Sequence, residues 1–143
     1  QTFTRWLEKV YGMGPFLAYE VACDLIYTDL LNHAPDINTW ANTGPGARRG
    51  LNRIARTYRP DPPPGALPHS SGHKYGVNIP EARAVKMMRQ LLHVSRNVDY
   101  WPQDSDHSPW DMRTVEHTLC EFDKYERVRL NEGKPRQIFR SGG

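Results

Sequence analysis

Helical periodicity is the feature of this sequence that most narrows its fold. Apolar residues recur at spacings of three and four along several segments, and no segment shows sustained alternation of apolar and polar residues. Three-and-four spacing places apolar side chains on one face of a helix, whereas a half-buried strand requires alternation. The sequence therefore predicts an all-α fold with long Pro- and Gly-rich loops.

Prolines and glycines set the expected limits of these helices. A proline fits the first helical turn because its ring fixes φ and its missing N–H would have no partner there. Ser108 can cap the last helix, and Gly133 can end it. The expected helices cover residues 3–11, 15–32, the arginine-rich stretch after the Gly-Pro-Gly turn at 44–46, 80–97 and 109–133.

The length and the net charge of the chain are consistent with a single helical domain that can bind nucleic acid. A chain of 143 residues is about one domain, so we expect a single unit over residues 1–143. The net charge of +3 permits nucleic-acid binding without requiring it. Because the chain enters a structured segment at once, we expect it to be part of a longer fold.

Several classes of protein are excluded by residue content. Cys23 and Cys120 both fall in helical patterns, which indicates reduced thiols in a cytosolic setting. No apolar run is long enough for a membrane span. His69 and His73 lack the spacing of a zinc site, and "GPGARRGL" lacks the ending of a nucleotide-binding Walker A loop. We expect no metal and no cofactor, and any kinase activity must belong to another chain or domain.

The turn at Gly12-Met13-Gly14-Pro15 joins the first two expected helices, which form a helix-hairpin-helix over residues 3–32. Backbone N–H groups at a helix N-terminus attract anions, and glycines allow a phosphate to approach closely. Gly12 and Gly14 are therefore predicted to bind phosphate. The alternative is that the turn only ends one helix and starts the next.

The stretch "VYGMGPFLAYEVACDL" resembles the helix-hairpin-helix of the DNA glycosylase superfamily. That resemblance implies that the glycines hold the DNA backbone and that Asp36, at a fitting interval after them, faces a base taken out of the stack. The alternative for Asp36 is a turn residue after Pro35. Where some members carry a Schiff-base lysine, this chain has Pro15-Phe16-Leu17, so lyase chemistry is not expected.

Together with "NTGPGARRGLNR" and "VEHTLCEFDKYER", this stretch resembles the alpha-glutamyl/putrescinyl thymine pyrophosphorylase group over residues 5–130. The group is associated with thymine hypermodification in bacteriophage DNA, and its members are also described as helical partners of 5-hydroxymethyluracil DNA kinases. The resemblance implies a uracil that carries a pyrophosphoryloxymethyl group, from which an amine displaces pyrophosphate.

Cationic groups are needed to hold such a leaving group. We predict that the start of the arginine-rich helix cradles a diphosphate, and the alternative is that its arginines contact DNA phosphates or solvent. In the loop before residue 80, His73 and Lys74 can meet phosphate or stack on a base. The predicted phosphate-binding residues here are Gly44, Gly46, Arg48, Arg49, Arg53, His73 and Lys74.

Asp36 is predicted to accept a proton from the amine or to stabilise developing positive charge, and Glu116 is the second predicted catalytic residue. Glu116, Cys120, Asp123 and Arg127 share one stripe of the last helix. This stripe is either a solvated face or a face packed against the hairpin or a pocket. Cys120 is a weak candidate for a nucleophile because the sequence places no base beside it.

The sequence thus favours an enzyme that transfers an amine or amino acid to a flipped 5-substituted pyrimidine in duplex DNA. Its predicted partners are DNA, the amine, and either a kinase domain or further N-terminal helices, in the host cytoplasm if the protein is phage-encoded. Two alternatives stay open. One is a monofunctional glycosylase that excises a modified base, and the other is a non-catalytic DNA-binding module.

Overall fold

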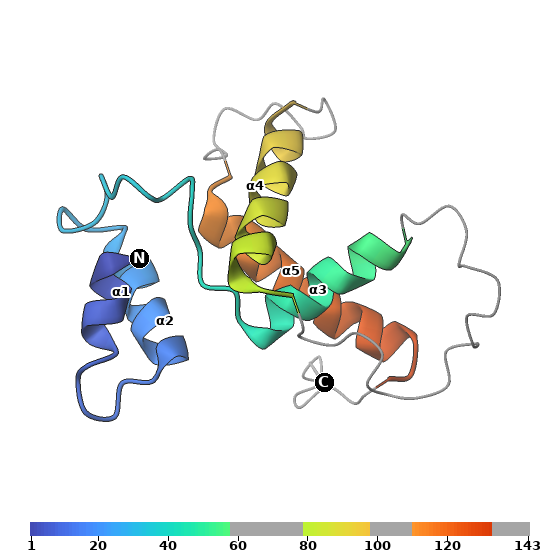
Figure 1. Cartoon of the computed structure of the whole chain (residues 1–143), viewed down its shortest axis with the longest axis horizontal. Helices are drawn as coiled ribbons and strands as arrows, with labels where there is room; N and C mark the ends of the chain where they lie inside the picture. The colour runs from blue at the N-terminus through green and yellow to red at the C-terminus, as the bar shows by residue number, and fades with distance from the viewer. Residues whose placement is uncertain (58–78, 98–109, 133–143) are drawn as a thin grey trace, which may run out of the picture.

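A computed structural model describes residues 1–57, 79–97 and 110–132 of the chain. Within these residues the structure is helical and contains no strand, which confirms the all-α prediction (Figure 1). The helices are α1 (Thr2–Leu7), α2 (Pro15–Leu25), α3 (Pro45–Thr57), α4 (Glu81–Asn97) and α5 (Met112–Arg129).

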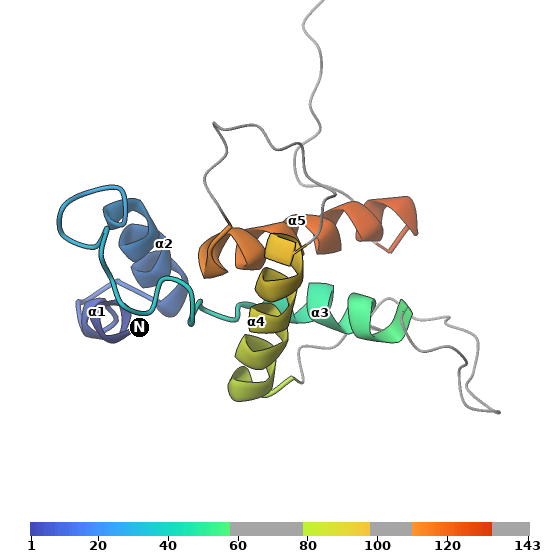
Figure 2. The same cartoon turned by 90° about the horizontal axis from the view of Figure 1, so that it is seen from above.

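Helices α3, α4 and α5 pack together and contain most of the core (Figures 1 and 2). α5 crosses α3, and α4 contacts both. Val85, Met88 and Leu92 of α4 are buried on the face that packs against the other two helices. The members of the core from these three helices are Ala47, Leu51, Ala84, Val85, Met88, Leu92, Met112, Val115 and Leu119.

Two glycines let α3 approach α5 closely. A Cβ on Gly50 would lie 2.5 Å from the backbone oxygen of Leu119, and a Cβ on Gly46 would lie 2.8 Å from the Cys120 sulfur. Distances this short exclude any side chain unless the helices move apart. The two glycines are four residues apart and therefore lie on the same face of α3, where they form the crossing point.

The α1/α2 hairpin lies beside these three helices and is joined to them by residues 26–44 (Figures 1 and 2). Tyr19 and Cys23 of α2 are buried and extend the core. The Tyr19 ring meets the Trp40 ring edge-on, with centroids 5.9 Å apart. From α4, the side chains of Arg89 and Arg96 bond Thr39 and Asn38 at 2.6 and 2.7 Å, which holds the joining segment in place.

The hairpin helices are shorter than predicted. α1 ends at Leu7 instead of residue 11, and the chain then turns through Gly12, whose φ is +80°. α2 ends at Leu25 instead of residue 32. There the Thr28 hydroxyl donates to the Leu25 carbonyl at 2.7 Å and accepts from the Leu30 N–H at 3.3 Å. These bonds compete with continued helix, as threonine often does near helix ends.

The start of α5 also differs from the prediction. Asp111 caps this helix, because its carboxylate accepts from the Thr114 N–H at 2.7 Å and from the Thr114 hydroxyl at 2.9 Å. The predicted cap Ser108 and the predicted stop Gly133 lie outside the described residues. An aspartate at this position satisfies an N–H that the helix itself cannot pair.

The crossing predicts that Gly50→Ala destabilises the protein. The added Cβ meets a backbone oxygen, so α3 and α5 must separate, and overpacking of this kind costs about 1–3 kcal/mol. Urea denaturation followed by circular dichroism measures the change in unfolding free energy.

Gly46→Ala is the variant to compare with Gly50→Ala, because its added Cβ would first contact the side-chain sulfur of Cys120 and not a backbone oxygen. Adding Cys120→Ala to Gly46→Ala should recover part of the lost stability. A Gly50→Ala protein as stable as the wild type would contradict the close crossing.

Candidate active site

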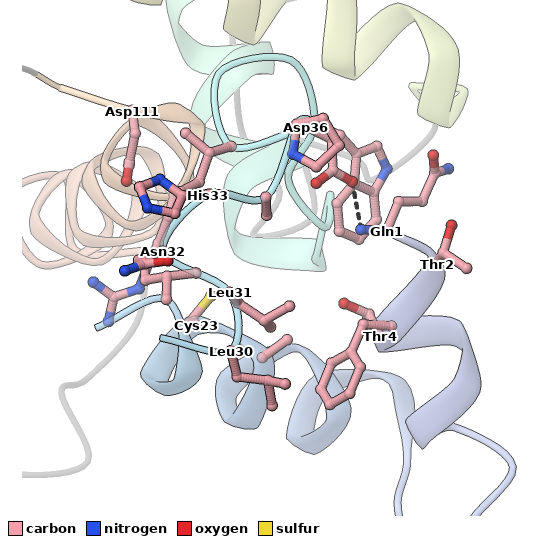
Figure 3. A pocket seen from close by; sticks show the side chains of 18 of the residues that line it. Gln1, Thr2, Thr4, Cys23, Leu30, Leu31, Asn32, His33, Asp36 and Asp111 are labelled. Atoms are coloured by element: carbon pink, nitrogen blue, oxygen red, sulfur yellow. Dashed lines mark hydrogen bonds and ion pairs between the residues drawn. The ribbon is translucent and has the colours of Figure 1, made fainter. Parts of the chain in front are cut away.

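A cavity of about 600 Å³ lies between the α1/α2 hairpin, residues 29–37 and the start of α5 (Figure 3). Its floor is apolar, and its polar groups come from three different segments of the chain. Apolar side chains such as Leu30 and Leu31, which the sequence placed in a helix, belong to this lining. The polar lining residues include Tyr19, Asp29, Asn32, His33, Asp36, Asp111 and Arg113.

Asp36, the first predicted catalytic residue, lines this cavity. Its side chain is 33% exposed, and its carboxylate lies 2.6 Å from the backbone nitrogen of Gln1 (Figure 3). Its backbone carbonyl accepts from the N–H groups of Thr39 and Trp40 at 3.0 and 2.9 Å, which fixes the turn that carries it. The carboxylate is therefore both accessible and held at a cavity wall.

The buried residues Tyr19 and Cys23 and the half-buried Arg113 form a polar corner of the cavity, referred to below as the Tyr19 corner. Burial raises the pKa of the Tyr19 hydroxyl far above its ordinary value. Burial likewise raises the pKa of the Cys23 thiol to about 11, although hydrogen bonding to Tyr19 and the nearby Arg113 charge act in the opposite direction. Both groups are therefore protonated at neutral pH.

The glycine turn is open, as phosphate binding requires, but it is remote from Asp36. A Cβ on Gly12 or Gly14 would meet no atom within 4 Å. Asp36 contacts Gln1, which precedes α1, whereas the turn follows α1. The turn and the carboxylate thus lie at opposite ends of the hairpin (Figure 1). A DNA strand held by the turn would have to run along the hairpin to present a base to the cavity.

Residues at the N-terminal end of α3 already bond to or pack against other residues of the protein. Arg48 donates from Nε to the Thr43 carbonyl at 2.7 Å and from Nη2 to the Thr43 hydroxyl at 3.0 Å. The Cβ position of Gly44 lies 3.9 Å from Oε1 of Glu116, and Gly46 packs on Cys120. The Glu116 carboxylate therefore lies beside the N-terminal end of α3, where the diphosphate was expected to bind.

Arg49 and Arg53 bind a buried aspartate. Their Nε atoms donate to the two oxygens of Asp123 at 2.7 and 2.9 Å, and Arg53 also bonds Glu132 at 2.7 Å. Arg53 is only 3% exposed and Asp123 is completely buried. The buried position of Arg53 therefore does not fit the predicted phosphate contact, because its guanidinium is paired with Asp123 and Glu132.

Glu116, the second predicted catalytic residue, is buried at the same interface and does not line the cavity. Its Oε1 accepts from the Cys120 thiol at 3.2 Å, and its Oε2 lies 3.7 Å from Nε2 of His117. Burial raises the pKa of the Glu116 carboxyl. Because Glu116 and Asp123 are both buried, the stripe on α5 is a packed face and the solvated alternative is wrong.

Cys120 is not a reactive thiolate. Burial, followed by the neighbouring Glu116 charge, raises its pKa to about 12. Cys23 and Cys120 are both free thiols. Cys120 packs against Gly46, which indicates a structural role. This agrees with the sequence, which made Cys120 a weak candidate for a nucleophile.

Two predicted phosphate contacts, His73 and Lys74, lie outside the described residues, as does the His69–His73 pair. Among the residues that the structure describes, no group of three or more His, Cys, Asp or Glu side chains is placed to hold a metal ion. In the same part of the chain, no helix combines the length and apolar character needed to cross a bilayer.

Sequence reasoning missed Tyr19 and Arg113 as site residues. Tyr19 and Cys23 are four residues apart on α2, so a shared face was visible in the sequence. Arg113 gave no such signal, because its position depends on where α5 begins relative to the hairpin. Its Nη1 donates to the Tyr27 hydroxyl at 2.9 Å, a contact between residues that are distant in the sequence.

The fold and the cavity define a helical domain with a polar-walled pocket large enough for a small molecule. A model of the family described as "5-hmdU DNA kinase, helical domain" matches residues 1–135, and the chain belongs to this family. Comparisons with curated proteins and with solved structures gave no match. Membership indicates involvement in thymine hypermodification, and it confirms at this coarse level the resemblance found in the sequence.

The buried ion pairs predict that Asp123→Ala strongly destabilises the protein. Removal of this carboxylate leaves the buried Arg53 guanidinium with one carboxylate partner fewer, and losing one partner of a buried pair costs about 3–5 kcal/mol. Chemical denaturation measures the loss. Glu121→Ala is the control, because the exposed pair of Glu121 with Lys124 is worth at most about 1 kcal/mol. Equal losses in the two variants would contradict a buried network.

The raised pKa of Glu116 predicts a pH dependence of stability. Folding favours the protonated form, so this residue's contribution is fully present below the ordinary glutamate value of 4.5 and is lost as pH rises through the raised pKa. Glu116→Gln should remove that part of the loss. Unfolding free energies measured at several pH values for both proteins test this, and parallel curves would contradict a raised pKa.

Proposed function

We propose that this domain transfers an amine to a flipped 5-substituted pyrimidine in DNA, with 5-pyrophosphoryloxymethyluracil as the substrate. The nitrogen–carbon bond forms at the 5-methylene while the carbon–oxygen bond to pyrophosphate breaks. The attacking amine must lose a proton, and Asp36 is the acceptor that we assign. Family membership supports the context of this reaction, and the cavity supports the place.

The observation that carries the proposal is the position of Asp36 in the wall of the cavity. Its carboxylate is partly exposed and anchored by backbone bonds to its turn. A volume of about 600 Å³ is within the usual range of small-molecule sites and holds a nucleobase together with a small co-substrate. A general base requires this combination of access and fixed position.

The exposed glycine turn supports an encounter with DNA. The N-terminus of α2 begins directly after Gly14, and its first residues are accessible. Backbone N–H groups at this end can receive a phosphate, with Gly12 at positive φ shaping the approach. In the proposed complex the DNA backbone passes this turn and follows the hairpin toward the cavity.

Glu116 has a supporting role in this proposal. Its buried carboxyl lies beside the start of α3 and bonds Cys120, so it fixes the packing of α3 on α5. Arg48 and Arg49 extend from the same part of α3, and their partly accessible sides are the remaining candidates for DNA phosphates.

Asp36→Asn should abolish transfer while leaving DNA affinity unchanged. The amide keeps the shape of the carboxylate but cannot accept the amine proton at neutral pH. Mass spectrometry of nucleosides is the measurement, after incubation of duplex DNA that carries hydroxymethyluracil pyrophosphate with the protein and candidate amines.

Asp24→Asn is the matched control, because Asp24 is exposed on α2 and does not line the cavity. Full activity of Asp36→Asn would remove Asp36 from the chemistry. Abasic sites in place of a gain in mass would indicate a glycosylase. DNA binding with unchanged nucleosides would indicate a docking module.

A further inference from the structure

We propose that Arg113 and Tyr19 form an oxyanion-binding subsite at one end of the cavity. Both residues line it, and both carry donor groups that lie in the Tyr19 corner. The inference rests on the proposed function for the identity of the ligand, while its test measures binding alone. The oxyanion would be either the phosphate of the 5-substituent or the carboxylate of an amino-acid co-substrate.

The first observation is the Tyr19 hydroxyl. The residue is 5% exposed, and the only hydrogen-bonding group beside its hydroxyl among the described residues is the Cys23 thiol, which is a weak partner. Buried hydroxyls are nearly always hydrogen-bonded, because burial without a partner destabilises the folded state. A donor of this kind at the wall of a cavity is satisfied when a ligand oxygen enters.

The second observation is the Arg113 guanidinium. Its Nη1 donates to the Tyr27 hydroxyl at 2.9 Å, and its central carbon lies 5.6 Å from the centre of the Tyr27 ring. Its Nε is buried without a hydrogen bond of ordinary geometry to a described residue, and the guanidinium also interacts with the Cys23 thiol. Tyr27 therefore positions the guanidinium while part of its donor fork stays available, and this fork suits a carboxylate or a phosphate.

The third observation concerns the charges around the Tyr19 corner: the carboxylates of Asp111 and Glu116 interact with Arg113, but Glu116 does not line the cavity. The Cys23 thiol is neutral at physiological pH, since burial raises its pKa to about 11. The nearest carboxylate in the sequence, Asp111, is already bonded to Thr114 as the cap of α5. The Arg113 charge is thus not cancelled inside the cavity by a thiolate.

The cavity has different charges at its two sides. Asp111 and His33 lie on one side, and Asp36 lies on the other (Figure 3). The charges of Arg113 and Asp111 interact, so the Arg113 cation lies near the Asp111 side of the cavity. A ligand that fits both ends has an oxyanion at Arg113 and a hydrogen-bond donor or amine at Asp36.

Calorimetric titration of the whole chain with inorganic pyrophosphate, and separately with glycine, tests the subsite. Arg113→Gln should weaken binding of the anion at least about tenfold, as expected when a hydrogen bond to a charged group is lost. Tyr19→Phe should weaken it several-fold and leave the fold intact, because only a hydroxyl whose sole protein partner is a thiol is removed. Arg83→Gln, which changes an exposed arginine of α4, should bind like the wild type.

The two probes distinguish the sources of the oxyanion. Binding of pyrophosphate that depends on Arg113 assigns the subsite to the 5-substituent, and binding of glycine assigns it to the co-substrate. If Arg113→Gln does not fold, Arg113→Lys keeps the charge without the fork and should bind more weakly than the wild type.

The proposal is overturned if the wild type binds neither probe, or if the Arg113 and Tyr19 variants bind both probes as tightly as the wild type does. Either result leaves the Asp36 experiment standing on its own. Conversely, oxyanion binding with no change in DNA nucleosides would retain the subsite and reject the transfer reaction.

Discussion

The close crossing of α3 and α5 is the constraint on which the rest of the structure depends. Gly46 and Gly50 allow the two helices to approach until backbone meets backbone, and the buried Asp123 then joins both arginines of α3 to α5. A buried carboxylate is tolerated only when it is paired and hydrogen-bonded. The glycines and the ion pairs therefore act at the same crossing, where both hold α3 against α5.

The cavity depends on that crossing through the position of α5. The backbone N–H of Met112 donates to the carbonyl of Ile37 at 3.2 Å, which ties the start of α5 to the segment that carries Asp36. Asp111 caps the helix at the same place, and Arg113 follows in its first turn. A shift of α5 along α3 would move one wall of the cavity relative to the hairpin, so packing in the core controls the geometry of the pocket.

Helical character was readable from the sequence because each helix carries its own apolar period and its own proline or glycine signals. The limits of α1 and α2 were predicted too long, since Leu30 and Leu31 fit a helical period yet serve as cavity lining. Asp36 was predicted from a motif, and it does line a cavity. Arg53 was predicted to bind phosphate, because a sequence does not reveal that a carboxylate on a distant helix neutralises it.

By itself the sequence determined the helical class, the open glycine turn and the family, because these rest on local spacing and on motifs. Only the tertiary structure decided which charges are available for a ligand. Arg53 was withdrawn into a buried ion-pair network, whereas Arg113 was brought to a cavity beside a tyrosine hydroxyl whose only protein partner is a thiol. The physical reason is that the availability of a charged group depends on its burial and its partners, and both are set by residues far away along the chain.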